Sequence, residues 1–383
     1  MRIGKKAGFM ILAFLCLAGC GQITTDTEDD WLEKAALNVD ISEEELYKAA
    51  LKEDVLIVYT VSTRTVQTKE AFEKAYPGLV VEIRDLRSPD LVDKVAENFA
   101  DGGTSCDVVI CNDNSGEFKS KLVDTGAVVP YLSAEIKKKM KDGHVGECIS
   151  FLDEAELLFY NSRLFETQPV NNIWELTESR FSGRIYIPNP LRSFSTYAFI
   201  AATFDHADEL EEAYKSWCGR DFDRKDGTAP ETLWKEISKN AVFTNSSDEV
   251  MEALNTDKAM LGIMISSKLR YKTMGYGFEP AYSLTPFSGC RTTVSVMLAR
   301  NSQNVNSAKL FIDFLLGGSD GTGDGYKPFR TPGAWSARTD VEDGTDTPLS
   351  DLDLLYPDAD SMIERKDAFY KFWSECLKDQ TNR

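Results

Sequence analysis

The stretch GRIYIPNPLRSFSTYAFIAA, residues 183–202, predicts a strand, a tight turn and a helix in direct succession. Arg184–Ile187 is the short strand, Pro188 and Pro190 bound the turn, and an apolar helix begins near Tyr197. This stretch is the best starting point from which to interpret the rest of the chain, because polar residues gather where the helix begins.

Those polar residues are Arg192, Ser193, Ser195 and Thr196. Hydroxyl groups at a helix start either cap the first backbone N–H groups or leave them free for a ligand. A helix N-terminus with a guanidinium beside it is suited to bind an anion. An ordinary helix cap with a solvated arginine is the alternative, and the stretch alone leaves both open.

Upstream, three short apolar runs predict buried strands: Val55–Tyr59, Leu79–Ile83 and Cys106–Ile110. Helical patterns separate them, one running through Phe72 and one over Asp90–Phe99. Strands and helices that alternate with short connections predict a parallel α/β sheet.

A second domain is expected downstream, because the chain is long enough for two. Glu156–Ser162 is a strand-like run and a candidate crossover into that domain. Ala259–Ile265 predicts another strand, and Thr292–Ala299 predicts a strand that crosses back.

Polar residues recur where these predicted strands stop, and ligands of α/β sheets bind beyond the carboxyl ends of strands. Each residue singly fits plain turn or cap chemistry. Their recurrence after the first and third strands favours a shared polar crevice. The candidates are Thr60, Ser62, Thr63, Asn112 and Asp113 in the first domain, and Ser266 and Ser267 in the second.

The start of the chain has the features of a secretory signal. Arg2, Lys5 and Lys6 precede a short apolar run that is too short for a membrane span. The run ends in Leu-Ala-Gly-Cys20, which matches the bacterial lipoprotein cleavage box, so Cys20 is expected to carry lipid. We therefore expect an extracytoplasmic protein that is anchored to the cell membrane by lipid alone.

The residues after the signal are acidic, and residues 21–40 are expected to form a tether. The whole chain has a formal charge of -19, which becomes more negative once the basic signal is removed. This acidity argues against nucleic acid as a partner and against a protein that lies flat on an anionic membrane.

The cysteines and histidines give no sign of a metal site. The chain has two histidines and no Cys-x-x-Cys pair, so a zinc site is not expected. We also expect no other metal and no cofactor. Six cysteines remain in the mature chain, and their spacing leaves both disulfides and buried free thiols open. They are Cys106, Cys111, Cys148, Cys218, Cys290 and Cys376.

In this order, the segments resemble the solute-binding proteins of bacterial ABC importers, in the branch that contains ferric-iron, hexose-phosphate and aminoethylphosphonate binders. The matching segments are spread over most of the mature chain. They are ALKEDVLIVYTVST, CDVVICND, LLFYNSRLF with IWELTESRFSGRIYIPNP, TDKAMLGIMIS, NSAKLFIDFLL and SARTDV. The tyrosine-asparagine pair in LLFYNSRLF adds Tyr160 to the candidate ligand residues.

The resemblance implies a type II periplasmic-binding-protein fold of class α/β, in which two lobes, each a mixed sheet flanked by helices, close on a ligand between them. Residues 41–155 and about 275–325 would form the first lobe. Residues 156–274 and about 326–383 would form the second. It also implies that residues 192–196 take the place of the polar turn that lines the family's cleft, although serines and Phe194 stand where glycines are common.

The chain departs from the ferric-iron members, which usually carry two tyrosines after the strand equivalent to Ala259–Ile265. Ser266 and Ser267 stand there instead, so we discount iron. We expect a monomeric, non-enzymatic protein that captures a small anionic solute, phosphorylated, phosphonate or carboxylate, and delivers it to the permease subunits of an ABC importer.

Three alternatives remain open from the sequence. The protein could report its ligand to a membrane sensor kinase, or it could serve as a scaffold. A secreted serine hydrolase would need a histidine, His144 or His206, close to Ser195 or Ser266, and the sequence lacks the Gly-x-Ser-x-Gly motif.

Overall fold

The computed structural model describes residues 26–112 and 114–381. The chain divides into two units, residues 1–38 and residues 39–383. In the first unit, Asp26–Ala35 forms helix α1 within the segment expected to be a tether. Its alanine, leucine, glutamate and lysine are strong helix formers, and Lys34 and Asp30 form an ion pair one turn apart.

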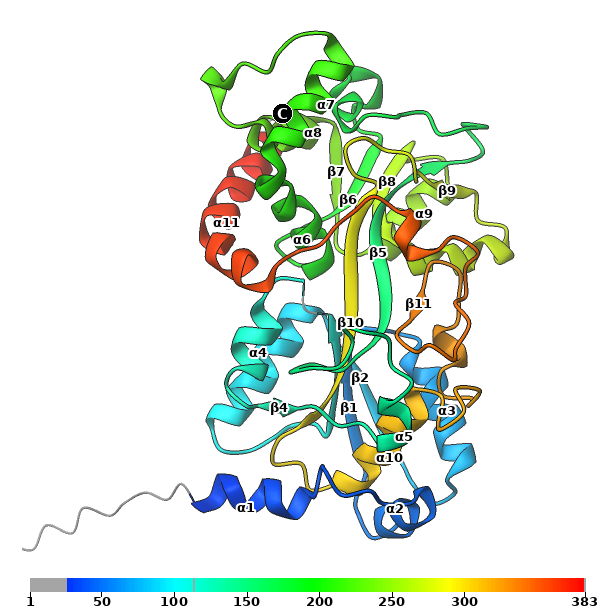
Figure 1. Cartoon of the computed structure of the whole chain (residues 1–383). Coiled ribbons are helices and arrows are strands. Elements are labelled where there is room, and N and C mark those ends of the chain that lie inside the picture. Colours follow the sequence, from blue (N-terminus) through cyan, green and yellow to red (C-terminus); the bar gives the residue numbers. More distant parts are fainter. Residues whose placement is uncertain (1–25, 113, 382–383) are drawn as a thin grey trace, which may run out of the picture. The chain divides into compact units, whose positions relative to one another are not determined.

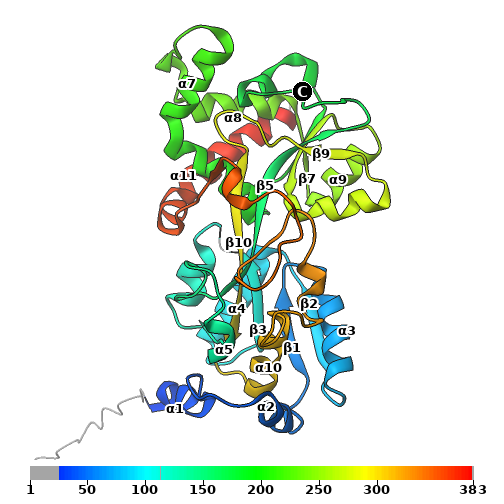
Figure 2. The ribbon, with the colours of Figure 1, turned by 45° about the vertical axis from the view of Figure 1, so that its right-hand side comes forward.

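The second unit begins with the first lobe, which is built on three parallel strands, β1 (Leu56–Thr60), β2 (Val81–Asp85) and β3 (Val108–Asn112). Figures 1 and 2 show α4 (Ser88–Ala100) on one side of these strands and α3 (Thr65–Ala75) with α10 (Val305–Leu315) on the other. This confirms the predicted parallel sheet. The shorter elements of this lobe are α2 (Glu43–Ala50), β4 (Val128–Val129) and α5 (Ala134–Lys137).

Two long strands connect the lobes. β5 (Ser150–Asn161) and β10 (Gly289–Ala299) run antiparallel side by side, and every residue of β5 is buried. The strand path of the sheet is β2-β1-β3-β10-β5-β8-β6-β7, so these two strands stand in the middle. Figure 1 shows them running from one lobe into the other. Both are longer than the sequence pattern predicted.

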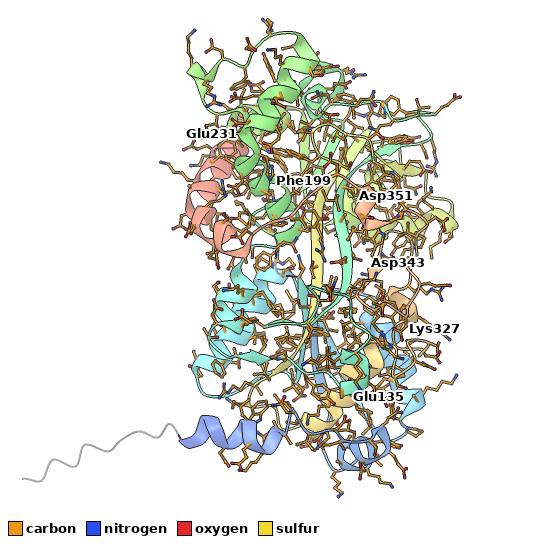
Figure 3. The ribbon with its side chains drawn as sticks, viewed as in Figure 1. Glu135, Phe199, Glu231, Lys327, Asp343 and Asp351 are labelled. Carbon is orange, nitrogen blue, oxygen red and sulfur yellow. The ribbon has the colours of Figure 1, made fainter. Side chains whose placement is uncertain are left out.

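The second lobe contains β8 (Leu261–Ile265), β6 (Ile185–Pro188) and β7 (Ala241–Thr244), with β6 parallel to both neighbours. Its core includes Tyr197 to Ala202 of α6 (Phe194–Ala202), whereas Phe194 belongs to the core cluster of the first lobe. Phe199, which is labelled in Figure 3, packs edge-on against Trp234 of α8 (Ala229–Asn240). The other elements are α7 (Ala207–Cys218), α9 (Ser247–Asn255), β9 (Phe278–Pro280), β12 (Leu354–Leu355) and α11 (Ala359–Thr381).

The return of the chain to the second lobe comes later than the sequence predicted. Phe329 packs against Phe151 and under Arg64, and β11 (Trp335–Ser336) pairs with the lower end of β5. These contacts keep residues 326–341 near the first lobe and the crossing strands. The final helix α11 then packs against α6 and α8 of the second lobe.

The described residues contain no helix that is long and apolar enough to cross a membrane. In this part of the chain, the six cysteines whose state the sequence left open form no disulfide with one another.

Candidate functional site

A cavity of about 440 Å³ lies where the carboxyl ends of strands from both lobes face each other. Residues at or after the ends of β1, β2 and β3 form one wall, and residues at or after the ends of β6, β7 and β8 form the other. The crossing strands contribute Glu154, Thr292 and Val294 between them. This is the position at which α/β sheets bind small molecules.

The wall from the first lobe contains three of the predicted residues, Ser62, Thr63 and Asn112. Thr60 is fully buried behind it, where its hydroxyl oxygen accepts from the backbone N–H of Ser62 at 3.0 Å. Thr60 therefore shapes the loop, and the structure does not place it in the cavity lining. Asp113 lies outside the described residues.

The same wall contains a buried ion pair that the sequence analysis missed. Arg64 donates through Nη2 to Glu154 Oε1 at 2.5 Å, and both side chains are less than one-tenth exposed. Its Nε donates to Ser62 Oγ at 3.2 Å, and its guanidinium lies 4.7 Å from the centre of the Phe329 ring. These contacts hold a charged pair at the back of the cavity, although Nη1 has no hydrogen-bond partner.

The opposite wall contains the turn with which the sequence analysis began. Arg192, Ser193 and Ser195 line the cavity, and Ser193 is the N-cap residue of α6, accepting from the N–H of Thr196. Arg192 Nη1 donates to Asn245 Oδ1 at 3.0 Å. Ser193 therefore caps the helix, as one of the two interpretations of this turn expected. Ser195 Oγ lies 3.2 Å from the Ser193 hydroxyl, and Ser195 also lines the cavity.

Thr196 is buried behind this turn and bonds to Glu156, a carboxyl group that the sequence analysis did not consider. The Thr196 hydroxyl donates to Glu156 Oε1 at 2.6 Å. Burial raises the pKa of Glu156 to about 7, against the hydrogen bonds of Thr196 and Ser195, which act to lower it. A titratable group therefore supports the wall of the cavity from inside.

The two serines after β8 have different positions. Ser267 lines the cavity, whereas Ser266 holds the end of β8 against its neighbours. Its hydroxyl accepts from the Ala155 N–H at 2.9 Å and donates to the carbonyl of Gly333. Gly333 has a φ of +78°, and a Cβ there would lie 2.2 Å from the Ser266 carbonyl oxygen, so this approach requires glycine.

Tyr160 is a predicted residue that lies outside the cavity lining. It lies on β5 beside Leu261 and Glu279 and belongs to the core of the second lobe, outside the cavity lining. A ligand role for Tyr160 has no support from this position.

Several charged residues of the lining were not predicted. Lys268 forms an ion pair with Asp248 at 2.5 Å, and Arg270 donates to the carbonyl of Ser267 at 2.8 Å. Their one sequence signal is that they closely follow Ser266 and Ser267 at a strand end. The further unpredicted members of the lining include Asp85, Arg87, Ser88, Asn245, Ser246 and Ser247.

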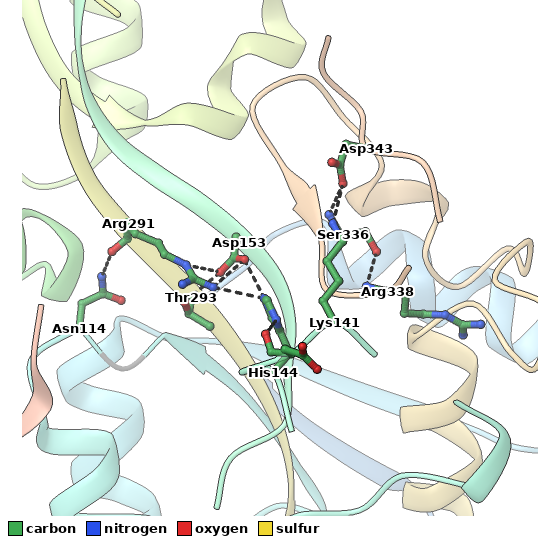
Figure 4. Close-up of polar contacts among 10 residues, drawn as sticks. Asn114, Lys141, His144, Asp153, Arg291, Thr293, Ser336, Arg338 and Asp343 are labelled. Carbon is green, nitrogen blue, oxygen red and sulfur yellow. Dashed lines mark hydrogen bonds and ion pairs between the residues drawn. The ribbon is translucent and has the colours of Figure 1, made fainter. Parts of the chain in front are cut away.

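Neither histidine contacts the candidate serines. His144 is buried, with Nε2 at 2.8 Å from Asp153 Oδ2, and Arg291 donates to the same carboxylate at 2.9 Å (Figure 4). His206 lies on the second lobe beside Glu209, with 3.0 Å between Nδ1 and Oε1. The contact that a serine hydrolase would need is therefore not formed by His144 or His206.

The family comparison decides the identity of this architecture. The model of the bacterial extracellular solute-binding proteins matches residues 65–319, which is most of the chain. The chain belongs to this family. A cavity between the carboxyl ends of two α/β lobes is consistent with an extracellular solute-binding protein.

Solved structures support the fold of this solute-binding protein. The iron-bound HitA of Pseudomonas aeruginosa aligns with a TM-score of 0.65 at 16% identity, over 85% of this chain and 99% of HitA. AfuA of Actinobacillus pleuropneumoniae, with fructose-6-phosphate bound, aligns with a TM-score of 0.64 at 18% identity, over 85% of this chain and 98% of AfuA.

A substrate-binding protein of an ABC transporter from Agrobacterium tumefaciens gives a TM-score of 0.66 at 12% identity, over 85% of this chain and 94% of that chain. No curated protein matches the sequence significantly. At these identities the structures establish the two-lobed fold of the solute-binding protein, and its ligand must be argued from its own residues.

Proposed function

We propose that this solute-binding protein captures a small anionic organic solute, phosphorylated, phosphonate or carboxylate, between its lobes and delivers it to an ABC permease. The cavity lining supports this most directly. Arg192 stands beside the N-cap of α6, together with the hydroxyls of Ser193 and Ser195. A helix N-terminus, a guanidinium and hydroxyl donors are a set that binds oxyanions.

Closure of the lobes would couple binding to delivery. A ligand that touches Ser62, Thr63 or Asn112 on one wall and Ser193 or Ser195 on the other stabilises the state in which both walls are close. The permease would then recognise that state, and a sensor kinase that uses the same closed surface is the alternative partner.

Lipid attachment at Cys20 is part of the proposal, and that residue lies outside the described part of the chain. The protein would act as a monomer tethered to the membrane by lipid. Detergent-dependent release of the full-length chain from a membrane fraction tests the tether, and release by salt alone would contradict it.

A thermal-denaturation panel tests the solute class. The panel contains sugar phosphates, phosphonates, di- and tricarboxylates, amino acids, polyamines and ferric citrate. A ligand at a hundred times its dissociation constant stabilises the folded state by about 2.7 kcal/mol, which raises the melting midpoint measurably. We expect the shift to be confined to anionic solutes, and a shift by polyamines or by iron alone would contradict the proposed class.

A further inference from the structure

The cationic side chains that line the cavity differ in whether a carboxylate neutralises them. Three of the cationic side chains that line it are already neutralised by carboxylates, and two are not. The neutralised pairs are Arg64 with Glu154 at 2.5 Å, Arg87 with Asp90 at 2.6 Å, and Lys268 with Asp248 at 2.5 Å. Within residues 26–112 and 114–381, Arg192 and Arg270 form no ion pair. Free positive charge in the cavity is therefore concentrated on these two arginines.

Arg270 is held by groups that orient its guanidinium without cancelling its charge. Nη1 donates to the carbonyl oxygen of Ser267 at 2.8 Å, and the guanidinium carbon lies 4.6 Å from the centre of the Tyr271 ring. A guanidinium has five N–H donors in a rigid fork, so these contacts leave donors for a ligand. The side chain is partly buried, which strengthens its interaction with an anion.

Arg192 is exposed, and it too is held by a neutral group, since Nη1 donates to the amide oxygen of Asn245 at 3.0 Å. The two arginines also belong to neighbouring parts of the sheet. Arg192 follows β6 and Arg270 follows β8, and these strands are parallel and hydrogen-bonded to each other. Parallel neighbours end at the same edge, so both guanidinium groups rise from one edge of the second lobe.

The wall of the first lobe is less favourable for the anionic group of a ligand. Asp85, at the end of β2, lines the cavity, and burial and nearby Asp248 raise the pKa of this carboxyl, against Lys268, which acts to lower it. A carboxylate in this position repels an anionic group from its side of the cavity. The charge distribution thus favours the anionic end of a ligand on the second lobe.

We propose that Arg192 and Arg270 together form a subsite for a doubly charged oxyanion, a phosphoryl or phosphonyl group, on the second lobe. This inference rests on the proposed function and narrows its solute class, because a monocarboxylate would satisfy one arginine and leave the other unpaired. Arg270 is the specificity-determining residue that separates the two charge states.

Inorganic phosphate at pH 8 is the probe, since its doubly charged form predominates there, and nitrate at matched ionic strength is the monoanion. We expect phosphate to raise the melting midpoint of the wild-type protein saturably and nitrate not to do so. Arg270→Gln should weaken phosphate binding roughly tenfold or more, because a charge-assisted contact is lost. Arg270→Lys should recover part of it.

Arg180→Gln is the matched control. Arg180 is also an arginine of the second lobe that lies over an aromatic ring, 4.5 Å from the centre of Phe181, and it does not line the cavity. Phosphate binding should be unchanged in this variant. The unliganded melting midpoints of all variants show whether they fold.

Two results would overturn the inference. One is a wild-type protein that phosphate does not stabilise, and the other is an Arg270→Gln variant that folds and binds phosphate as tightly as the wild type. The proposed function would survive either result if the wild-type protein still bound an anionic carboxylate from the solute panel. Binding of no anion in that panel would instead defeat the proposed function itself.

Discussion

The fold strongly changes the pKa of the Glu156 carboxyl group. It is fully buried on β5, Oε1 accepts from the Thr196 hydroxyl at 2.6 Å, and Oε2 has no hydrogen-bond partner. A buried carboxylate with an unpaired oxygen is costly, so the neutral form is favoured. Burial therefore raises the pKa of Glu156 to about 7, although the hydrogen bonds of Thr196 and Ser195 act to lower it.

Stability should therefore depend on the protonation of Glu156. Its folded pKa lies above the usual value near 4.5, so the folded state binds the proton more tightly than the unfolded state. The stabilisation is fully present below about pH 4.5 and is lost as the pH rises through about 7. The loss amounts to roughly 3 kcal/mol at most, since one pKa unit corresponds to about 1.4 kcal/mol.

Glu156→Gln keeps the shape of the side chain and cannot ionise. Urea denaturation at pH 5 and pH 8 measures the free energy of unfolding of both proteins. The stability of the variant relative to the wild type should be higher at pH 8 than at pH 5. The comparison with wild type cancels the contribution of other groups, such as Asp313, whose pKa is also raised to about 7 by burial. A difference between variant and wild type that is the same at both pH values would contradict this account.

At the same scale, the neutral polar residues of the site and Arg192 were largely predictable, and the other charged residues were not. Ser62, Thr63, Asn112, Ser193 and Ser195 follow or lie near strand ends, and the rule for α/β sheets places them in the cavity. A lysine or arginine after a strand is usually a solvated surface residue, so nothing local distinguishes Arg270. Only the pairing of β6 with β8 places Arg270 on the same wall of the cavity as Arg192.

Among the elements, β5 and β10 determine how the lobes are joined. Asp153 on β5 accepts from Arg291 Nε and Nη2 at 2.9 Å and from the hydroxyl of Thr293 at 2.9 Å, both on β10, and His144 Nε2 lies 2.8 Å away (Figure 4). Burial acts to raise the pKa of Asp153, but the hydrogen bonds of His144 and Arg291 outweigh it and lower the pKa.

Asp153→Asn should destabilise the protein by about 2–4 kcal/mol, because it leaves the charge of Arg291 without its buried partner. Urea denaturation at pH 7 measures the loss. Because the pKa is lowered in the folded state, the difference between wild type and variant should shrink on acidification.

Asp124→Asn is the control for that variant, because Asp124 is about half exposed and pairs with Lys119 at the surface. The free energy of unfolding of this control variant should fall by less than about 1 kcal/mol. An Asp153→Asn variant that lost no more stability than this control would show that the network does not hold the crossing strands together.

The sequence predicted the existence of these elements better than their extent. The β-branched runs of β1, β2 and β3 identified the parallel sheet, since their periodicity is local. The first half of β5, Ser150–Ala155, contains Asp153 and Glu154, and acidic residues are rare in buried strands. Their partners, Arg291 and Arg64, lie far away in the sequence, so the strand was recognised from residue 156 onward alone.

For the whole molecule, the topology explains why one cavity collects residues from so many segments. The strands that follow the α/β pattern end at the cavity in both lobes, and β5 and β10 pass between them. A ligand in the cavity can therefore contact both lobes at once, which is the condition for ligand-stabilised closure. The order of the segments predicted this architecture. The position of residues 326–341 near the first lobe depends on contacts with residues far away in the sequence, such as that of Phe329 with Phe151.

Hydrogen–deuterium exchange with and without the anion that gives the largest thermal shift tests this account most directly. It compares the exchange of backbone amides along the whole chain. We predict slower exchange with the anion in both walls, at residues 61–64 of the first lobe and at residues 193–196 and 266–270 of the second. Protection confined to one lobe, or found only away from these segments, would contradict a solute site between the lobes.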